Sequence, residues 1–148
     1  MSTEAPTEQK APRRVVMKGA SLRLPDDLAE AALEGSRCPK CSETFYPPRH
    51  VCLACYHEGL DRVALSRKGT LYTFTIGRLA PPRAIVQAPY VIAQVQLPEN
   101  VIVATVLTDV DPEKVRIGMP LELVVEKATV DADGNEVMAF KFRPGKEG

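Results

Sequence analysis

The sequence predicts a mainly β protein with an N-terminal helix, a rubredoxin-like zinc ribbon and an OB-fold barrel of five strands. Two C-x-x-C pairs close together predict the ribbon. Alternating apolar residues over most of the second half predict the strands. We therefore divide the chain into a disordered tail (1–20), a docking helix (21–36), the zinc ribbon (37–61) and the OB-fold domain (62–144).

The composition restricts the function classes. The chain has 148 residues, of which 45% are hydrophobic, which suits one packed domain with a small appendage. Its 19 basic and 19 acidic side chains balance, which argues against a general polyanion binder. No apolar run reaches the ~20 residues that span a bilayer, and the N-terminus lacks the apolar stretch of a secretory signal. We expect a cytoplasmic protein with reduced thiols and no membrane association.

The N-terminal third contains two expected elements. Residues 1–20 are polar, charged and proline-rich without periodicity, so we expect a disordered tail. In the next segment, Pro25 suits a first helical turn, Asp26 and Asp27 favour a helix N-terminus, and Gly35 can end the helix. A helix of about three turns is marginal alone in water, so we expect it to dock on its own domain or on a partner.

Five segments after residue 62 have the period-2 pattern of strands and are rich in β-branched and aromatic residues. They cover residues 71–76, 90–97, 101–107, 119–127 and 136–142. Asp133-Gly134 suits a hairpin turn between the last two, and Pro98-Glu99-Asn100 suits a tight connection between two earlier ones. Five strands of this length favour a small closed barrel of the OB type.

The four cysteines have the spacing of metal ligands. Cys38-x-x-Cys41 and Cys52-x-x-Cys55 are separated by ten residues. Each C-x-x-C turn presents two sulfurs to one ion, and two such turns complete a tetrahedral thiolate shell around zinc. A closed shell leaves no position for a reactive water, so we predict a structural zinc ion. Such binding contributes roughly 10–16 kcal/mol to folding, enough to order a segment with little apolar core.

Other interpretations of the cysteines fit less well. A redox C-x-x-C usually occurs once, near a βαβ pattern, and a disulfide pair is disfavoured in a reducing compartment. Iron also binds four thiolates, but the paired spacing favours zinc. His50 and His57 lie near the cysteines, and we expect them at the surface or beside the ligands because four thiols already suffice.

No catalytic constellation stands out. Both histidines lie in the ribbon, and the chain has no Gly-rich phosphate loop. Asp109 and Asp111 flank Val110 before a proline, which is typical of a turn rather than of an acid/base pair. Because the thiols are committed to metal, we expect no independent enzymatic activity.

Four segments together resemble a known family. They are CPKCSETFYPPRHVCLAC, GTLYTFTI, APYVIAQVQL and DPEKVRIGMPLELVVE. Their order and spacing resemble the zinc-ribbon and OB-fold proteins that accompany thiolase-like acyl-CoA enzymes, from the expected helix to Pro144. The resemblance implies a non-catalytic accessory subunit of an acyl-CoA acyltransferase (thiolase) complex that cleaves or forms 3-oxoacyl-CoA. It also implies a thiolase-like catalytic partner that binds the helix and ribbon, two copies of each chain, and CoA or acyl-CoA as a ligand of the complex.

The resemblance raises the question of CoA contacts. CoA carries phosphates and an adenine, so cationic side chains beside an apolar wall would suit it. Arg78 and Arg83 lie in a proline-rich loop between strands, and Lys68 lies just before the strand that holds Tyr72. The alternative is that all three are ordinary solvated charges. The acyl group stays open between aromatic, steroid, fatty-acid and isoprenoid metabolism.

Two rival functions remain. Zinc ribbons and OB barrels also occur in single-stranded nucleic-acid-binding proteins. The balanced charge, the absence of Trp, and Glu122 and Glu126 on an exposed strand face argue against that function. The second rival is a structural adaptor that never contacts CoA. An independent acyl-CoA hydrolase lacks the residues it would need.

Overall fold

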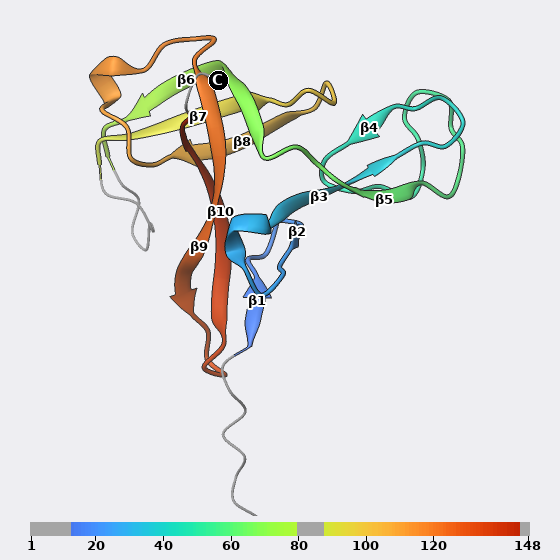
Figure 1. The fold of residues 1–148 in the computed structure, drawn as a ribbon, viewed down its shortest axis with the longest axis horizontal. Coiled ribbons are helices and arrows are strands. Elements are labelled where there is room, and N and C mark those ends of the chain that lie inside the picture. The colour runs from blue at the N-terminus through green and yellow to red at the C-terminus, as the bar shows by residue number, and fades with distance from the viewer. Residues whose placement is uncertain (1–12, 80–87, 146–148) are drawn as a thin grey trace, which may run out of the picture.

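The computed structural model describes residues 13–79 and 88–145, which form two sheets (Figure 1). The larger sheet has six strands, β1 (Arg14–Val16), β6 (Lys68–Gly77), β7 (Tyr90–Gln96), β8 (Ile102–Leu107), β9 (Pro120–Val130) and β10 (Glu136–Pro144). The smaller sheet has four, β2 (Leu22–Arg23), β3 (Ala32–Arg37), β4 (Thr44–Phe45) and β5 (Asp61–Ala64). Two short 3₁₀ turns are η1 (Leu28–Glu30) and η2 (Pro112–Lys114).

Strands β6 to β10 close into the predicted five-stranded barrel. The strand order is β10-β8-β7-β6-β9, and β9 also pairs with β10, which closes the ring. Neighbours are antiparallel except for β8 and β10, which run parallel and meet at Leu107 and Phe142. The five segments expected from the alternating pattern match β6 to β10, so the OB-type barrel is confirmed.

The barrel core contains the residues that the period-2 pattern grouped together. Phe142 is fully buried, and β7, β9 and β10, with the residue after β7, supply further large core side chains, Val91, Val95, Leu97, Leu121, Leu123 and Met138. In β6 the register against β7 shifts between Leu71 and Thr73. This bulge changes the phase of the alternation, so that the buried Leu71 and the partly buried Phe74 both face the core, while Tyr72 is 51% exposed.

The predicted docking helix over residues 21–36 is wrong. Asp27 does cap a helical start, accepting from the Ala29 N–H at 2.9 Å, but η1 lasts only three residues and Ala31 is already extended. The following residues, Ala32–Arg37, form β3, which pairs with β2, β4 and β5. Backbone pairing on both sides of this segment outweighs its weak local helix preference.

Gly35 illustrates why the helix prediction failed. We interpreted it as a helix-ending glycine, but it lies inside β3 with its Cα against the neighbouring strand. A Cβ built at this position would lie 2.6 Å from the Phe45 carbonyl oxygen and 3.1 Å from the Leu65 side chain. The glycine therefore permits close approach of strands rather than the end of a helix.

Part of the expected tail is also ordered into the fold. Arg14–Val16 form β1, which pairs in parallel with Glu136–Met138 of β10. The expectation of disorder over residues 1–20 is therefore wrong for β1, and residues 1–12 lie outside the described part. Two successive valines supply the β preference that the surrounding polar composition concealed.

The predicted turns are confirmed. Asp131 accepts hydrogen bonds from the N–H groups of Asp133 and Asn135 in the β9–β10 hairpin, and Gly134 has φ of 82°. Asp111 caps η2 by accepting from the Glu113 N–H at 3.0 Å, which agrees with the turn interpretation.

In the part of the chain that the structure describes, no helix has the length and apolar character needed to cross a membrane.

Candidate metal centre

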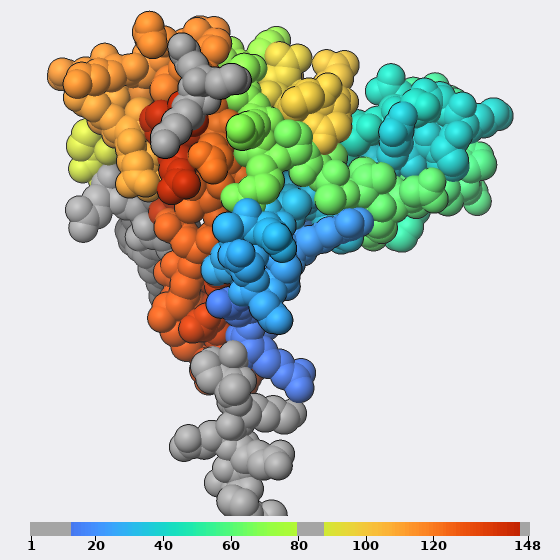
Figure 2. All heavy atoms as spheres, viewed as in Figure 1, coloured from blue at the N-terminus to red at the C-terminus, as the bar shows by residue number. Residues whose placement is uncertain are grey.

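The cysteines lie in a lobe that projects beside the barrel (Figures 1 and 2). Two knuckles in this lobe have the same backbone. The Ser42 N–H donates to the Cys38 carbonyl and the Tyr56 N–H to the Cys52 carbonyl, each at 2.9 Å. Ser42 and Tyr56 both adopt a left-handed conformation, with φ of 66° and 63°. Each turn thereby directs its two thiols to the same side.

The four sulfurs converge on one point. The Cys38 and Cys55 sulfurs are 3.6 Å apart, and the Cys41 and Cys52 sulfurs are 3.5 Å apart. All four lie within 4.8 Å of one another. Zn–S bonds of about 2.3 Å place the sulfurs of a tetrahedral site about 3.8 Å apart, so the arrangement fits zinc. The four cysteines are therefore placed for metal binding.

The local backbone favours thiolates at Cys52 and Cys38. The N–H groups of Ala54 and Cys55 point at the Cys52 sulfur, at 3.3 and 3.4 Å. Burial raises the pKa of Cys52, but these donors outweigh it and lower the pKa to about 7. Burial also raises the pKa of Cys38, and the N–H groups of Cys41 and Lys40 more than compensate, so this pKa is lowered too. At Cys41 the Glu43 N–H lowers the pKa, but burial and the neighbouring thiols raise it to about 12, and the pKa of Cys55 is raised as well. Metal binds the deprotonated sulfur, so the donors at Cys52 and Cys38 support the site.

Neither histidine belongs to the cluster. Among the residues that the structure describes, the group of possible ligands contains the four cysteines and no histidine. His50 is exposed, and its carbonyl accepts from the Gly59 N–H at 2.9 Å. His57 is half-buried, and its carbonyl accepts from the Cys52 N–H at 2.9 Å. Their backbones shape the second knuckle, as expected for residues beside the ligands.

Two residues that the sequence analysis did not single out attach the ribbon to the rest of the fold. Ser36 is fully buried, and its hydroxyl accepts from the Arg49 N–H at 2.9 Å. The Tyr46 hydroxyl accepts from the Ser21 N–H at 3.0 Å. The only sequence signal was the Tyr-Pro-Pro-Arg run between the cysteine pairs, whose long-range partners have no local pattern.

The structure describes two of the three candidate CoA residues and does not bring those two together. Lys68 begins β6 and Arg78 follows its end, so the two exposed cations lie at opposite ends of one ten-residue strand. Arg83 lies outside the described residues. The neighbouring Arg67 serves the fold, because its guanidinium donates to the carbonyls of Ala31 and Leu123.

A tetrathiolate knuckle pair attached to a closed five-stranded OB barrel defines a class of small zinc-ribbon and OB-fold proteins. Models of the ChsH2 zinc ribbon and of the ChsH2 C-terminal OB-fold domain match residues 26–61 and 62–126. The chain belongs to the ChsH2 family, as the resemblance predicted. The family's ribbon model begins at residue 26 and so includes η1 and β3.

Relatives cover most of the chain. A DUF35 domain-containing scaffold protein of Methanocaldococcus jannaschii is 35% identical over 76% of this chain and 81% of the relative. The benzoylsuccinyl-CoA thiolase subunit BbsA of Thauera aromatica is 30% identical over 97% of this chain and 99% of the relative. A solved structure of an Ltp2-ChsH2(DUF35) aldolase superimposes with a TM-score of 0.64 at 31% identity, covering 76% of this chain and 84% of that chain.

Proposed function

We propose that this chain is a non-catalytic accessory subunit of a thiolase-like complex that cleaves or forms 3-oxoacyl-CoA. The observation that carries the proposal is the end-to-end alignment with a protein named as a thiolase subunit, over 97% of this chain and 99% of the relative. The Ltp2-ChsH2 aldolase, in which a chain of this fold accompanies an enzyme, gives independent support.

The site geometry agrees with an accessory role. The four thiols face one another in a closed cluster, which provides no open coordination position for a substrate or water. Within residues 13–79 and 88–145, the histidines hydrogen-bond through their backbone carbonyls, and neither side chain bonds to a nucleophile or a carboxylate. Among the described residues, neither histidine is therefore placed as the base of a nucleophile.

Zinc would serve the structure of the ribbon. Cys38, Cys41, Cys52 and Cys55 would hold it, and the bound ion would cross-link two knuckles whose surroundings contain few buried apolar side chains. The knuckles also expose apolar side chains, since Val51, Leu53 and Tyr56 are 40%, 56% and 78% exposed. An apolar group this exposed suits the docking of the ribbon on a catalytic subunit.

The remaining assignments extend the same proposal. The complex would contain two copies of each chain, because oligomers favour closed symmetry. CoA would reach this chain through the exposed cations Arg78 and Lys68 at the two ends of β6, together with Arg83. In this proposal the acyl substrate belongs to aromatic or steroid catabolism, and the name of the benzoylsuccinyl-CoA thiolase subunit supports the aromatic alternative.

Co-purification tests the proposal. A tagged full-length chain is expressed in its native host, and its partners are identified by mass spectrometry and weighed as an intact complex. We expect a thiolase-fold subunit in equal amount, thiolase activity in the complex, and no turnover by this chain alone. Robust turnover by the isolated chain, or tight and salt-dependent binding of single-stranded DNA with no protein partner, would refute it.

A further inference from the structure

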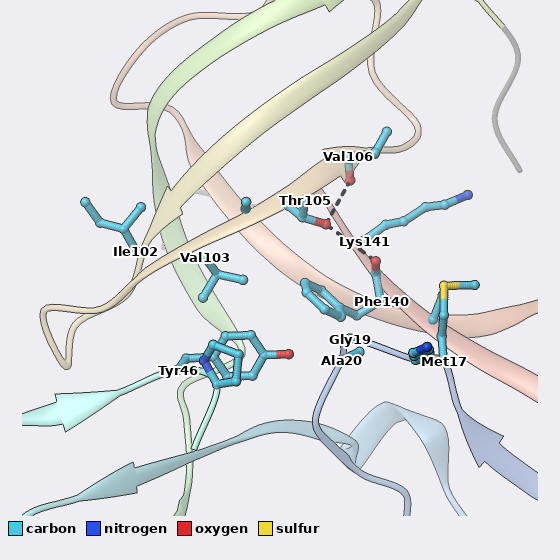
Figure 3. A pocket seen from close by; sticks show the side chains of 14 residues that line it. Met17, Gly19, Ala20, Tyr46, Ile102, Val103, Thr105, Val106, Phe140 and Lys141 are labelled. Atoms are coloured by element: carbon cyan, nitrogen blue, oxygen red, sulfur yellow. Dashed lines mark hydrogen bonds between the residues drawn. The ribbon is translucent and has the colours of Figure 1, made fainter. Parts of the chain in front are cut away.

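A groove lies where β8 and β10 separate (Figure 3). It has a volume of about 520 Å³, and its other wall consists of residues 17–20 with Tyr46 and Pro47 of the ribbon. β10 pairs with β1 through Glu136–Met138 and meets β8 only at Phe142. Between these two contacts, β10 has no strand partner on the groove side among the described residues.

β8 directs free backbone groups toward the same groove. Its residues pair with β7 on one side over Ile102–Leu107. The N–H of Thr108, the residue after β8, donates to the Phe142 carbonyl of β10 at 2.8 Å. The backbone groups of Thr108 therefore point away from β7, and those of the even-numbered residues of β8 point the same way. Because these groups alternate along an antiparallel ladder, the N–H and C=O of Ala104 and Ile102 also point to this edge.

The β10 side of the groove has the same property. The Met138 carbonyl accepts from the Met17 N–H at 2.9 Å, and the Phe142 carbonyl accepts from the Thr108 N–H at 2.8 Å. Phe140 lies between them in the alternation, so its backbone groups face the groove as well. Its carbonyl accepts only a long 3.4 Å bond from the Thr105 hydroxyl. The groove therefore offers strand-type donors and acceptors.

The β8 edge also lacks the usual protection. Edge strands normally carry charges, prolines or bulges that prevent pairing with another chain. The sequence of β8 is IVATVL, without charge or proline, and its register with β7 is continuous. Ile102 is 43% exposed beside this edge. An edge of this kind is suited to receive a further strand.

We propose that the groove receives an extended segment of the catalytic partner subunit, which pairs with β8 at Ile102–Val106 as an added strand. The inference rests on the proposed function, because it requires that partner. Five residues of strand span about 17 Å, so the segment is at least that long. The apolar walls favour alternating apolar side chains. The groove's cations, Lys18 and Lys141, disfavour a basic segment, and Lys18 favours an acidic residue beside it because Lys141 already pairs with Glu126 at 3.0 Å.

Other occupants fit the groove less well. Residues 1–12 include Glu4, Glu8 and Lys10 and have no apolar alternation, so they lack the chemistry of the walls. A second copy would have to bring β8 in together with its neighbour β7, whereas Tyr46 and residues 19–20 stand opposite β8 (Figure 3). A single extended strand of the partner can have the apolar alternation that residues 1–12 lack, and it brings no second strand into the residues opposite β8.

Amide hydrogen exchange of the purified complex against the free chain tests the inference. We expect the Ala104 and Phe140 amides to exchange at least tenfold more slowly in the complex. Unchanged exchange in a complex that does contain the thiolase-fold subunit would overturn the added strand while leaving the proposed function intact. Protection that appears in the chain alone and grows with its concentration would assign the groove to a second copy and also overturn it.

A matched pair of variants gives an independent readout. Ala104→Pro removes the N–H that faces the groove and keeps the bonds to β7, whereas Ala104→Val adds volume and keeps the N–H. We expect the proline variant to bind the partner subunit about tenfold more weakly and the valine variant to bind within twofold of the wild type. Equal affinity of all three chains, with unchanged thermal unfolding, would refute the inference. If the proline variant does not fold, the exchange measurement on the wild type decides.

Discussion

The ring of Tyr46 in the ribbon meets the ring of Phe140 in β10 edge-on, with centroids 6.1 Å apart and planes at 88°. The Tyr46 hydroxyl also accepts from the Ser21 N–H at 3.0 Å. One side chain therefore contacts the ribbon, the N-terminal segment and the barrel. This arrangement holds the metal-binding lobe in a defined position beside the β8–β10 groove.

Two substitutions of Tyr46 should separate the contribution of its hydroxyl from that of its ring to the stability of the fold. Tyr46→Phe removes the acceptor of the Ser21 N–H and should lower the free energy of unfolding by about 1 kcal/mol. Tyr46→Ala also removes the aromatic pair and part of the buried surface, and should cost about 2–4 kcal/mol. Urea denaturation of the zinc-loaded chain measures both. An alanine variant as stable as the wild type would show that the ring contact does not stabilise the fold.

Removal of the metal should unfold the ribbon and spare the barrel. We expect one zinc per chain by elemental analysis, and Cys52→Ser should lose it, because the remaining three thiolates leave the shell open. Lys40→Ala, at an exposed position in the first knuckle, is the control and should retain zinc. After chelation, amide resonances of 38–56 should collapse while those of β6 to β10 persist. A chain made with ample zinc that contains none contradicts this prediction.

Phe142 should be the most sensitive core position tested. Its side chain is fully buried where β8 and β10 meet, so Phe142→Ala should lower the free energy of unfolding by about 3–5 kcal/mol. Tyr72→Ala is the control, because Tyr72 is 51% exposed and its loss should cost about 0.5 kcal/mol or less. Denaturant titrations of the two variants compare them. Equal destabilisation would argue against the barrel core described above.

Gly35→Ala should destabilise the ribbon attachment. The added Cβ would lie 2.6 Å from the Phe45 carbonyl, so β3 and β4 would have to move apart at a cost of about 1–3 kcal/mol. Gly145→Ala is the matched control, since its Cβ would meet only ordinary contacts at 3.4 Å or more. Thermal unfolding measures both variants. A neutral Gly35→Ala would mean that this close strand approach is absent in solution.

The CoA proposal predicts a charge effect in the assembled complex. Arg78→Ala combined with Arg83→Ala should weaken CoA binding by about a hundredfold or more, because each hydrogen bond to a charged group contributes roughly 1.5–3 kcal/mol. Lys68→Ala examines the other end of β6 separately. Lys127→Ala, an exposed lysine of β9, is the control. Calorimetric titration of the complexes with CoA gives the affinities, and wild-type affinity in every variant would leave this chain without a role in CoA binding.

Much of the barrel and the metal centre could be predicted from the sequence. Strand alternation is a local property, so the positions of β7, β9 and β10 and the burial of Val95, Leu123 and Phe142 follow from it. The spacing of the cysteines likewise encodes the two knuckles, because each C-x-x-C turn is complete within a few residues.

The tertiary structure decided what depends on distant partners. The segment after Pro25 has the caps of a helix, but three other strands, β2, β4 and β5, pair with Ala32–Arg37 and hold it extended. Pairing with another strand also explains two features that the local sequence did not predict. These are β1, which pairs with β10, and the bulge at Leu71, where β6 pairs with β7. The β8–β10 groove is the clearest case, because the assembled sheet decides which strand edges stay unpaired. The sequence of β8 contains no charge or proline that would mark it as an edge strand.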